Sequence, residues 1–288
     1  MPGDATLPTV APCPVGTGSL PSVPSDVLSR PASPPDFTVA YGDDPEQIAD
    51  VRVPAPGTTA QPLVVFIHGG FWRAAWDRTH AGPLAEGLAA LGYPVACLEY
   101  RRVGQAGGGW PGTLSDVDTG VRDLPELIAV AIAERDGEPL DTARPILMGH
   151  SAGGHLALWA GRHMGADRTR GVVALAPVAD LTKAYQRGLG GGAVAELLGG
   201  GPPDVPERYA AADPAANLPL GVPAVIVHGE LDEDVPVDVG ADFVERARQV
   251  EPTISLRRLP GVDHVELIDP LAPAWAEVIA ALGVIASN

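Results

Sequence analysis

The stretch ILMGHSAGGHLALWAG (residues 146–161) passes from an apolar run, through a serine flanked by glycines, into a second apolar run. The first run predicts a buried strand and the second a helix. Gly149 and Gly153 place Ser151 in the pattern Gly-x-Ser-x-Gly, in which the serine occupies a strained turn and projects its hydroxyl above the sheet. The helix that follows points its free N–H groups to the same place. The sequence therefore predicts Ser151 as a nucleophile, with a plain turn of small residues as the alternative.

Strands and helices alternate on both sides of this corner. Such alternation predicts an α/β fold, with a mostly parallel, twisted sheet that is covered by helices on both faces. We expect strands within residues 36–42, 48–55, 62–70, 93–100, 144–150, 170–180, 222–230 and 254–261, and helices within 79–91, 113–137, 152–164, 239–251 and 271–287.

Two segments do not follow this rhythm. Residues 1–35 form a proline-rich leader that we expect to be extended or disordered, with an ordered arm along the surface as the alternative. Residues 36–288 then make up one domain. Within it, residues 181–220 hold glycine runs and prolines, and so long an interval is usually functional. We expect a small helical lid there.

Charge and composition exclude several classes of protein. The 288 residues carry a net charge of −17, which disfavours nucleic acids and anionic membranes as partners. No apolar run is long enough to span a membrane, and no signal-like region follows Met1, so we expect a cytoplasmic protein. Cys13 and Cys97 have no CxxC partner, so we expect no metal and no cofactor. The oligomeric state stays open, with a homodimer as one option.

A serine hydroxyl needs a base to accept its proton, and the base needs an acid that orients it. His264 follows the last expected strand, and Asp232 follows the strand before it. Parallel sheets gather their sites at the carboxyl ends of strands, and the chain order Ser151, Asp232, His264 is the order of α/β-hydrolases. Glu230 and Asp234 are the rival acids.

The other histidines lack this placement. We expect His228 to be a structural residue bonded to backbone, and we expect surface or packing roles for His80, His155 and His163.

The loop HGGFW (residues 68–72) follows an early expected strand. Two glycines let backbone approach a ligand closely, and preorganised N–H groups stabilise the charge of an acyl-transfer transition state. We therefore expect Gly69, Gly70 and Ala152 to form the oxyanion hole, with a simple Gly-Gly turn as the alternative. We expect His68 to anchor the loop by hydrogen bonds.

Four motifs, HGGFW, GHSAGG, HGELDEDVP and GVDH, together resemble the α/β-hydrolase superfamily over residues 60–285. They are most similar to the esterase and lipase branch with an HGG-type oxyanion loop. Here an aromatic pair replaces the third glycine of the HGGG form, and this variant is similar to kynurenine formamidases (arylformamidases), which hydrolyse N-formylkynurenine. The resemblance implies an α/β-hydrolase fold and a serine hydrolase that needs no cofactor.

Aromatic residues near these loops suggest a pocket. We expect some of Phe71, Trp72 and Trp110 to line an acyl or aryl pocket, with ordinary core packing as the alternative. For Tyr100 and Arg101, which follow a strand, we expect structural roles.

We therefore expect a serine carboxylesterase that cleaves an ester of a small to medium acyl or aryl substrate through an acyl-enzyme. The alternatives are an arylformamidase, a hydrolase-fold biosynthetic lyase, cyclase or transferase, and a non-catalytic binding protein.

Overall fold

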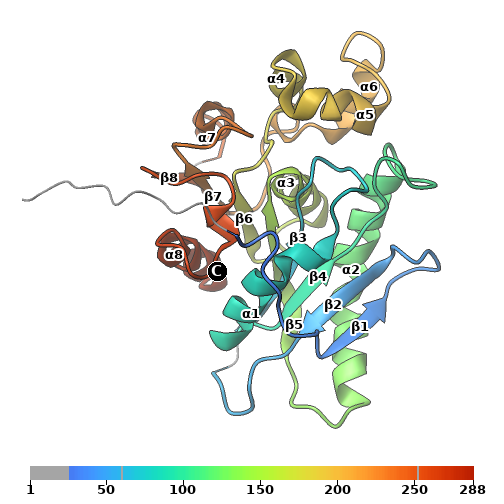
Figure 1. Ribbon diagram of the computed structural model, residues 1–288, viewed down its shortest axis with the longest axis vertical. Helices are drawn as coiled ribbons and strands as arrows, with labels where there is room; N and C mark the ends of the chain where they lie inside the picture. Colours follow the sequence, from blue (N-terminus) through green and yellow to red (C-terminus); the bar gives the residue numbers. More distant parts are fainter. Residues whose placement is uncertain (1–25, 60, 252) are drawn as a thin grey trace, which may run out of the picture.

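An eight-stranded sheet forms the centre of the computed structural model, which describes residues 26–59, 61–251 and 253–288 (Figure 1). The strand order is β1-β2-β4-β3-β5-β6-β7-β8. The strands are β1 (Phe37–Ala40), β2 (Ile48–Arg52), β3 (Pro62–Ile67), β4 (Val95–Leu98), β5 (Asp141–His150), β6 (Gly171–Leu175), β7 (Ala224–Gly229) and β8 (Ile254–Leu259).

The pairs β1–β2 and β2–β4 are antiparallel, and the remaining pairs are parallel. Seven strands lie within the expected ranges, and β5 begins at Asp141, three residues before its expected start, so the predicted mostly parallel α/β sheet is confirmed. Because β3 to β8 run in one direction, the loops that follow them meet at one edge of the sheet.

Helices cover both faces, and successive residues of the central strands point to opposite faces. In β3, Val65 and Ile67 pack into the core under α2, α3 and α7, whereas Val64 and Phe66 pack under α1 and α8. The five helices are α1 (Gly82–Ala90), α2 (Gly112–Ala133), α3 (Ala152–Met164), α7 (Val237–Arg248) and α8 (Trp275–Ala286).

The interval between β6 and β7 is helical, and Figure 1 shows its helices gathered beyond one end of α3. Among its contacts with the loops near Ser151, Arg73 Nε lies 2.6 Å from Glu196 Oε2, and the Trp110 amide donates to Leu197 O over 2.7 Å. Its elements are α4 (Leu181–Gln186), η2 (Leu189–Gly191), α5 (Ala193–Leu198), α6 (Pro206–Ala212) and η3 (Pro214–Ala216).

The proline-rich leader is only partly described. Residues 1–25, including Cys13, lie outside the described residues, whereas residues 26–35 follow the surface as an ordered arm. Cys97 is buried in β4, and burial raises the pKa of its thiol to about 12. Among the helices described, none is long and apolar enough to cross a membrane.

Backbone segments pack tightly at the corner between β5 and α3. A Cβ atom added to Gly153 would lie 2.0 Å from Ile67 O, and one added to Gly149 would lie 2.2 Å from Gly153 O. These neighbours are backbone atoms, which cannot rotate away as the end of a side chain can. The two glycines therefore let α3 start directly against the end of β3.

Replacing Gly153 with alanine should lower the free energy of unfolding by roughly 1–3 kcal/mol or more, because the new methyl group must push two backbone segments apart. Gly283→Ala in α8 is the matched control, because a Cβ there meets nothing within 4 Å and alanine favours a helix. Urea unfolding of both variants measures the difference. Equal stability of the two would show that the corner is not close-packed.

Candidate active site

Ser151 lies in the turn between β5 and α3, with φ 57° and ψ −120°. A positive φ is uncommon for a residue with a side chain and marks local strain. The amide of Ser151 donates to Leu175 O of the neighbouring strand over 2.8 Å, which fixes the turn against the sheet. The predicted strained corner is therefore present at this serine.

His264 and Asp232 come from the loops after β8 and β7 and lie in direct contact. His264 Nδ1 donates to Asp232 Oδ2 over 2.6 Å. Asp232 Oδ1 accepts the amide of Val235 over 2.8 Å, which holds the carboxylate in place. Asp232 is thus the acid that reaches His264, whereas Glu230 pairs with Arg258 at 3.2 Å.

Burial alone would raise the pKa of Asp232. Hydrogen bonds from His228 and His264 outweigh burial and hold the pKa well below its ordinary value. Asp232 therefore stays a carboxylate at neutral pH and can accept the hydrogen bond that orients the imidazole of His264.

Two further histidines support this pair. His228 Nε2 lies 2.8 Å from Val235 O, and His150 Nε2 lies 2.9 Å from His264 O. Burial, together with the nearby His264, lowers the pKa of His150 well below its usual value, so His150 stays neutral. His228 is bonded to backbone, as expected, and the support from His150 was not foreseen.

Ser151 and His264 face the same cavity, which has a volume of about 150 Å³. Among the described residues the Ser151 hydroxyl makes no hydrogen bond. The hydrogen bond between Asp232 and His264 is therefore formed, whereas the one between His264 and Ser151 is not. Catalytic hydrogen bonds are often long before substrate binds. The cavity is lined by Leu28, Gly70, Phe71, Trp76, His80, His150, Ser151, Asp234, His264 and Val265.

The loop HGGFW approaches this cavity with an unusual backbone. Gly70, Phe71 and Trp72 all have positive φ (109°, 53° and 56°). In the described part of the chain, the amides of Gly69, Gly70 and Phe71 donate to no protein acceptor. Ala152 begins α3, where the first amides have no partner within the helix. The loop and the helix start therefore supply free N–H groups on the side of Ser151, and Phe71 joins the three predicted donors.

A buried carboxylate holds this loop in place through hydrogen bonds. Glu99, which is 0% exposed, contacts His68 Nε2 at 2.9 Å and accepts the Arg78 amide at 3.0 Å. Tyr100 donates its hydroxyl to His68 O over 2.9 Å, and its ring stacks on that of His68. His68 and Tyr100 thus have the expected structural roles. Glu99 was missed, although a lone carboxylate at the end of an apolar strand is a signal in the sequence.

The aromatic residues divide between the cavity and the core. Phe71 lines the cavity, whereas Trp72 is 1% exposed and packs its ring edge-to-face with His155. The two neighbours therefore lie in different environments, although both have positive φ. Trp110 packs against the core beneath the helical interval. The expectation of a pocket role is therefore corrected for Trp72 and Trp110.

Other cavity residues were not expected from the sequence. Trp76 is 40% exposed, and its ring meets that of His80 edge-to-face at 5.6 Å. Burial is the main cause that lowers the pKa of His80 to about 4, so its ring is neutral at neutral pH. Leu28 enters from the arm, far away in sequence. His155, farther from the cavity, forms a hydrogen bond from its Nε2 to Ala212 O over 2.9 Å.

The BD-FAE family model matches residues 49–246, which is more than half of the chain. The chain therefore belongs to the BD-FAE family, a family of α/β-hydrolases. Among solved structures, a truncated form of a carbohydrate esterase from gut microbiota superposes with a TM-score of 0.73 at 18% identity, over 90% of this chain and 99% of that one. This likeness confirms the fold.

Curated relatives are similar over most of this chain. A probable isoprenylcysteine alpha-carbonyl methylesterase of Oryza sativa subsp. japonica is 26% identical over 255 residues, which are 81% of this chain and 59% of the relative. Esterase LipC of Mycobacterium tuberculosis is 27% identical over 251 residues, which are 80% of this chain and 60% of the relative. The chain thus spans about 60% of the length of these curated relatives.

Asp232→Asn should lower kcat by roughly 10⁴-fold, because an amide neither favours the imidazolium nor fixes the tautomer of His264. The control is Asp234→Asn, two residues away, which changes a rival carboxylate that forms no hydrogen bond with His264 in the described part of the chain. Steady-state hydrolysis of p-nitrophenyl acetate measures both variants. A larger loss in Asp234→Asn than in Asp232→Asn would overturn the assignment of the acid.

Proposed function

We propose that this member of the BD-FAE family is a serine carboxylesterase in which Ser151 is the nucleophile, His264 the general base and Asp232 the residue that orients His264. The observation that carries the proposal is the 2.6 Å contact between His264 and Asp232 beside a cavity that Ser151 shares. The named relatives are esterases, which favours an ester over a formamide as substrate.

The reaction starts when His264 Nε2 accepts the hydroxyl proton and Ser151 Oγ bonds to the carbonyl carbon of the ester. The electron pair of the C=O bond moves to its oxygen, which the amides of Gly69, Gly70, Phe71 and Ala152 stabilise. The pair then returns, the bond to the leaving oxygen breaks, and His264 gives its proton to that oxygen. Alcohol leaves, and an acyl-enzyme remains on Ser151.

Water completes the cycle by the same route. His264 accepts a proton from water, the oxygen of which attacks the acyl carbonyl. When the intermediate collapses, His264 protonates Ser151 Oγ and the carboxylic acid is released. Every proton thus passes through His264.

The cavity favours a small acyl group. Its volume of about 150 Å³ is below the about 300–1,000 Å³ typical of ligand pockets, and Leu28, Phe71, Trp76 and Val265 give it apolar walls. The helical interval 181–220 adjoins the oxyanion loop through the Arg73–Glu196 pair, which supports its role as a lid. A cytoplasmic location and a homodimer stay predictions of the sequence.

An activity panel tests the proposal, with p-nitrophenyl acetate, butyrate and octanoate beside N-formylkynurenine. The wild type should hydrolyse the short esters in preference to the formamide. Ser151→Ala should lose activity by roughly 10⁴-fold or more, because no other group supplies the nucleophile. Ser115→Ala, an exposed serine on α2, serves as the matched control and should behave as wild type.

Two outcomes of this panel would contradict the proposal. Unchanged activity in Ser151→Ala would reject the mechanism. A preference of the wild type for N-formylkynurenine would replace the esterase by an arylformamidase that uses the same residues.

A further inference from the structure

The N-terminal arm, residues 26–35, is attached to the domain at several points. Arg30 donates to both carboxylate oxygens of Asp269, over 2.5 Å and 3.0 Å. The Ser33 amide donates to Glu86 Oε1 of α1 over 2.6 Å, and Arg52 of β2 donates to Ser33 Oγ over 2.9 Å. These contacts fix the course of the arm across the loop that carries His264 and across α1.

This attachment places an arm residue in the active-site cavity. Leu28 lines the cavity together with Ser151 and His264. Leu28 lies two residues before Arg30, and Arg30 bonds Asp269. Asp269 follows His264 by five positions in the chain. The arm also lies outside residues 49–246, which the family model matches. One wall of the proposed active site is therefore supplied by a segment outside that match.

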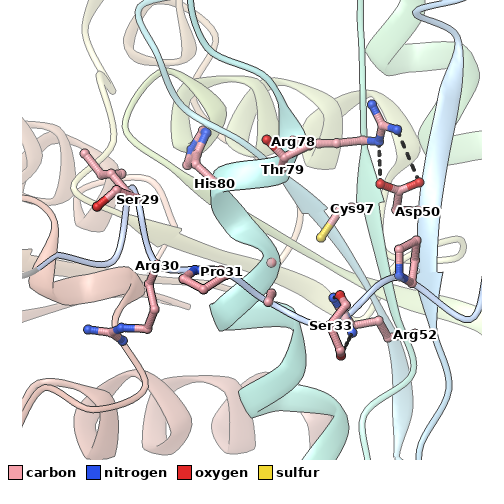
Figure 2. Close-up of a pocket in the computed structure, with 14 residues that line it drawn as sticks. Ser29, Arg30, Pro31, Ser33, Asp50, Arg52, Arg78, Thr79, His80 and Cys97 are labelled. Carbon is pink, nitrogen blue, oxygen red and sulfur yellow. Dashed lines mark hydrogen bonds and ion pairs between the residues drawn. The ribbon is translucent and has the colours of Figure 1, made fainter.

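A second cavity of about 350 Å³ lies under the same arm. Figure 2 shows Arg30, Pro31 and Ser33 on one side of it, and His80, Cys97 and the Arg78–Asp50 ion pair on the other. Its wall mixes prolines, alanine and a thiol with serine hydroxyls and paired guanidinium groups. It can therefore hold the apolar chain of a substrate and still offer hydrogen bonds to a polar end.

Leu28 and His80 line both cavities. His80 is 8% exposed, and its Nδ1 atom is buried with no hydrogen-bond partner among the described residues. Its ring is held between His68 and Trp76, edge-to-face at 5.6 Å from each. The residues that the two cavities share are thus one ring held by aromatic neighbours and one side chain from the arm.

We propose that Leu28 is a specificity-determining residue, which closes the active-site cavity against the cavity under the arm and so limits the length of the acyl group that the enzyme accepts. The inference rests on the proposed function, because it needs the acyl group to lie beside Ser151. Removing the Leu28 side chain joins the two cavities, and enlarging it closes the boundary further. Arg30 is a positioning residue, which holds Leu28 there through Asp269.

The test compares kcat/KM for p-nitrophenyl acetate, butyrate and octanoate across variants of the full chain. Leu28→Ala should raise the ratio of octanoate to acetate by roughly 10-fold or more, because each additional methylene gains buried contacts. Leu28→Trp should lower the same ratio. Arg30→Met should shift the ratio in the direction of Leu28→Ala. Leu271→Ala, a leucine that is 77% exposed, is the matched control and should leave the ratio unchanged.

The ratio separates specificity from stability, because a loss of folded enzyme lowers the rates on all esters equally. Opposite shifts in Leu28→Ala and Leu28→Trp support the inference. An unchanged ratio in both variants overturns it, even where their rates fall. The proposed function is judged separately in the same assay, by the hydrolysis of acetate by wild type and its loss in Ser151→Ala.

Discussion

The close approach of backbone at the start of α3 is the constraint on which the rest of the site depends. With no Cβ on Gly149 or Gly153, the helix begins against the carbonyl of Ile67, at the point where β3 ends. This contact brings the HGGFW loop, which follows β3, beside Ser151, which follows β5. Ser151, which has a strained backbone, and the loop, which has free amides, then line one small cavity.

Burial and charge act together around that cavity. Asp232 and Glu99 are both buried carboxylates, and in each the pKa is lowered because hydrogen bonds outweigh the cost of burial. Asp232 holds the proposed base, and Glu99 holds the loop through His68. One buried anion thus holds the proposed base, and another holds the loop that carries the proposed oxyanion donors.

The sequence predicted what depends on local pattern. Apolar runs predicted the eight strands. The loops that follow these strands pointed to Ser151, Asp232 and His264, because parallel strands end at one edge of the sheet. Leu28 and Glu99 depend on contacts far apart in the sequence, such as that of Arg30 with Asp269, which no local pattern records. Trp72 was one of three pocket candidates, and its core position depends on a contact with His155, far away in the sequence, which no local pattern records.

Covalent labelling with a fluorophosphonate tests most directly whether Ser151 is an activated nucleophile. Such a reagent reacts with a serine only when a base removes its proton and amides stabilise the charged oxygen. Peptide mass spectrometry should find one adduct, on Ser151, with labelling greatly slowed in His264→Gln. An adduct on another residue, or equal labelling of wild type and His264→Gln, would contradict the account.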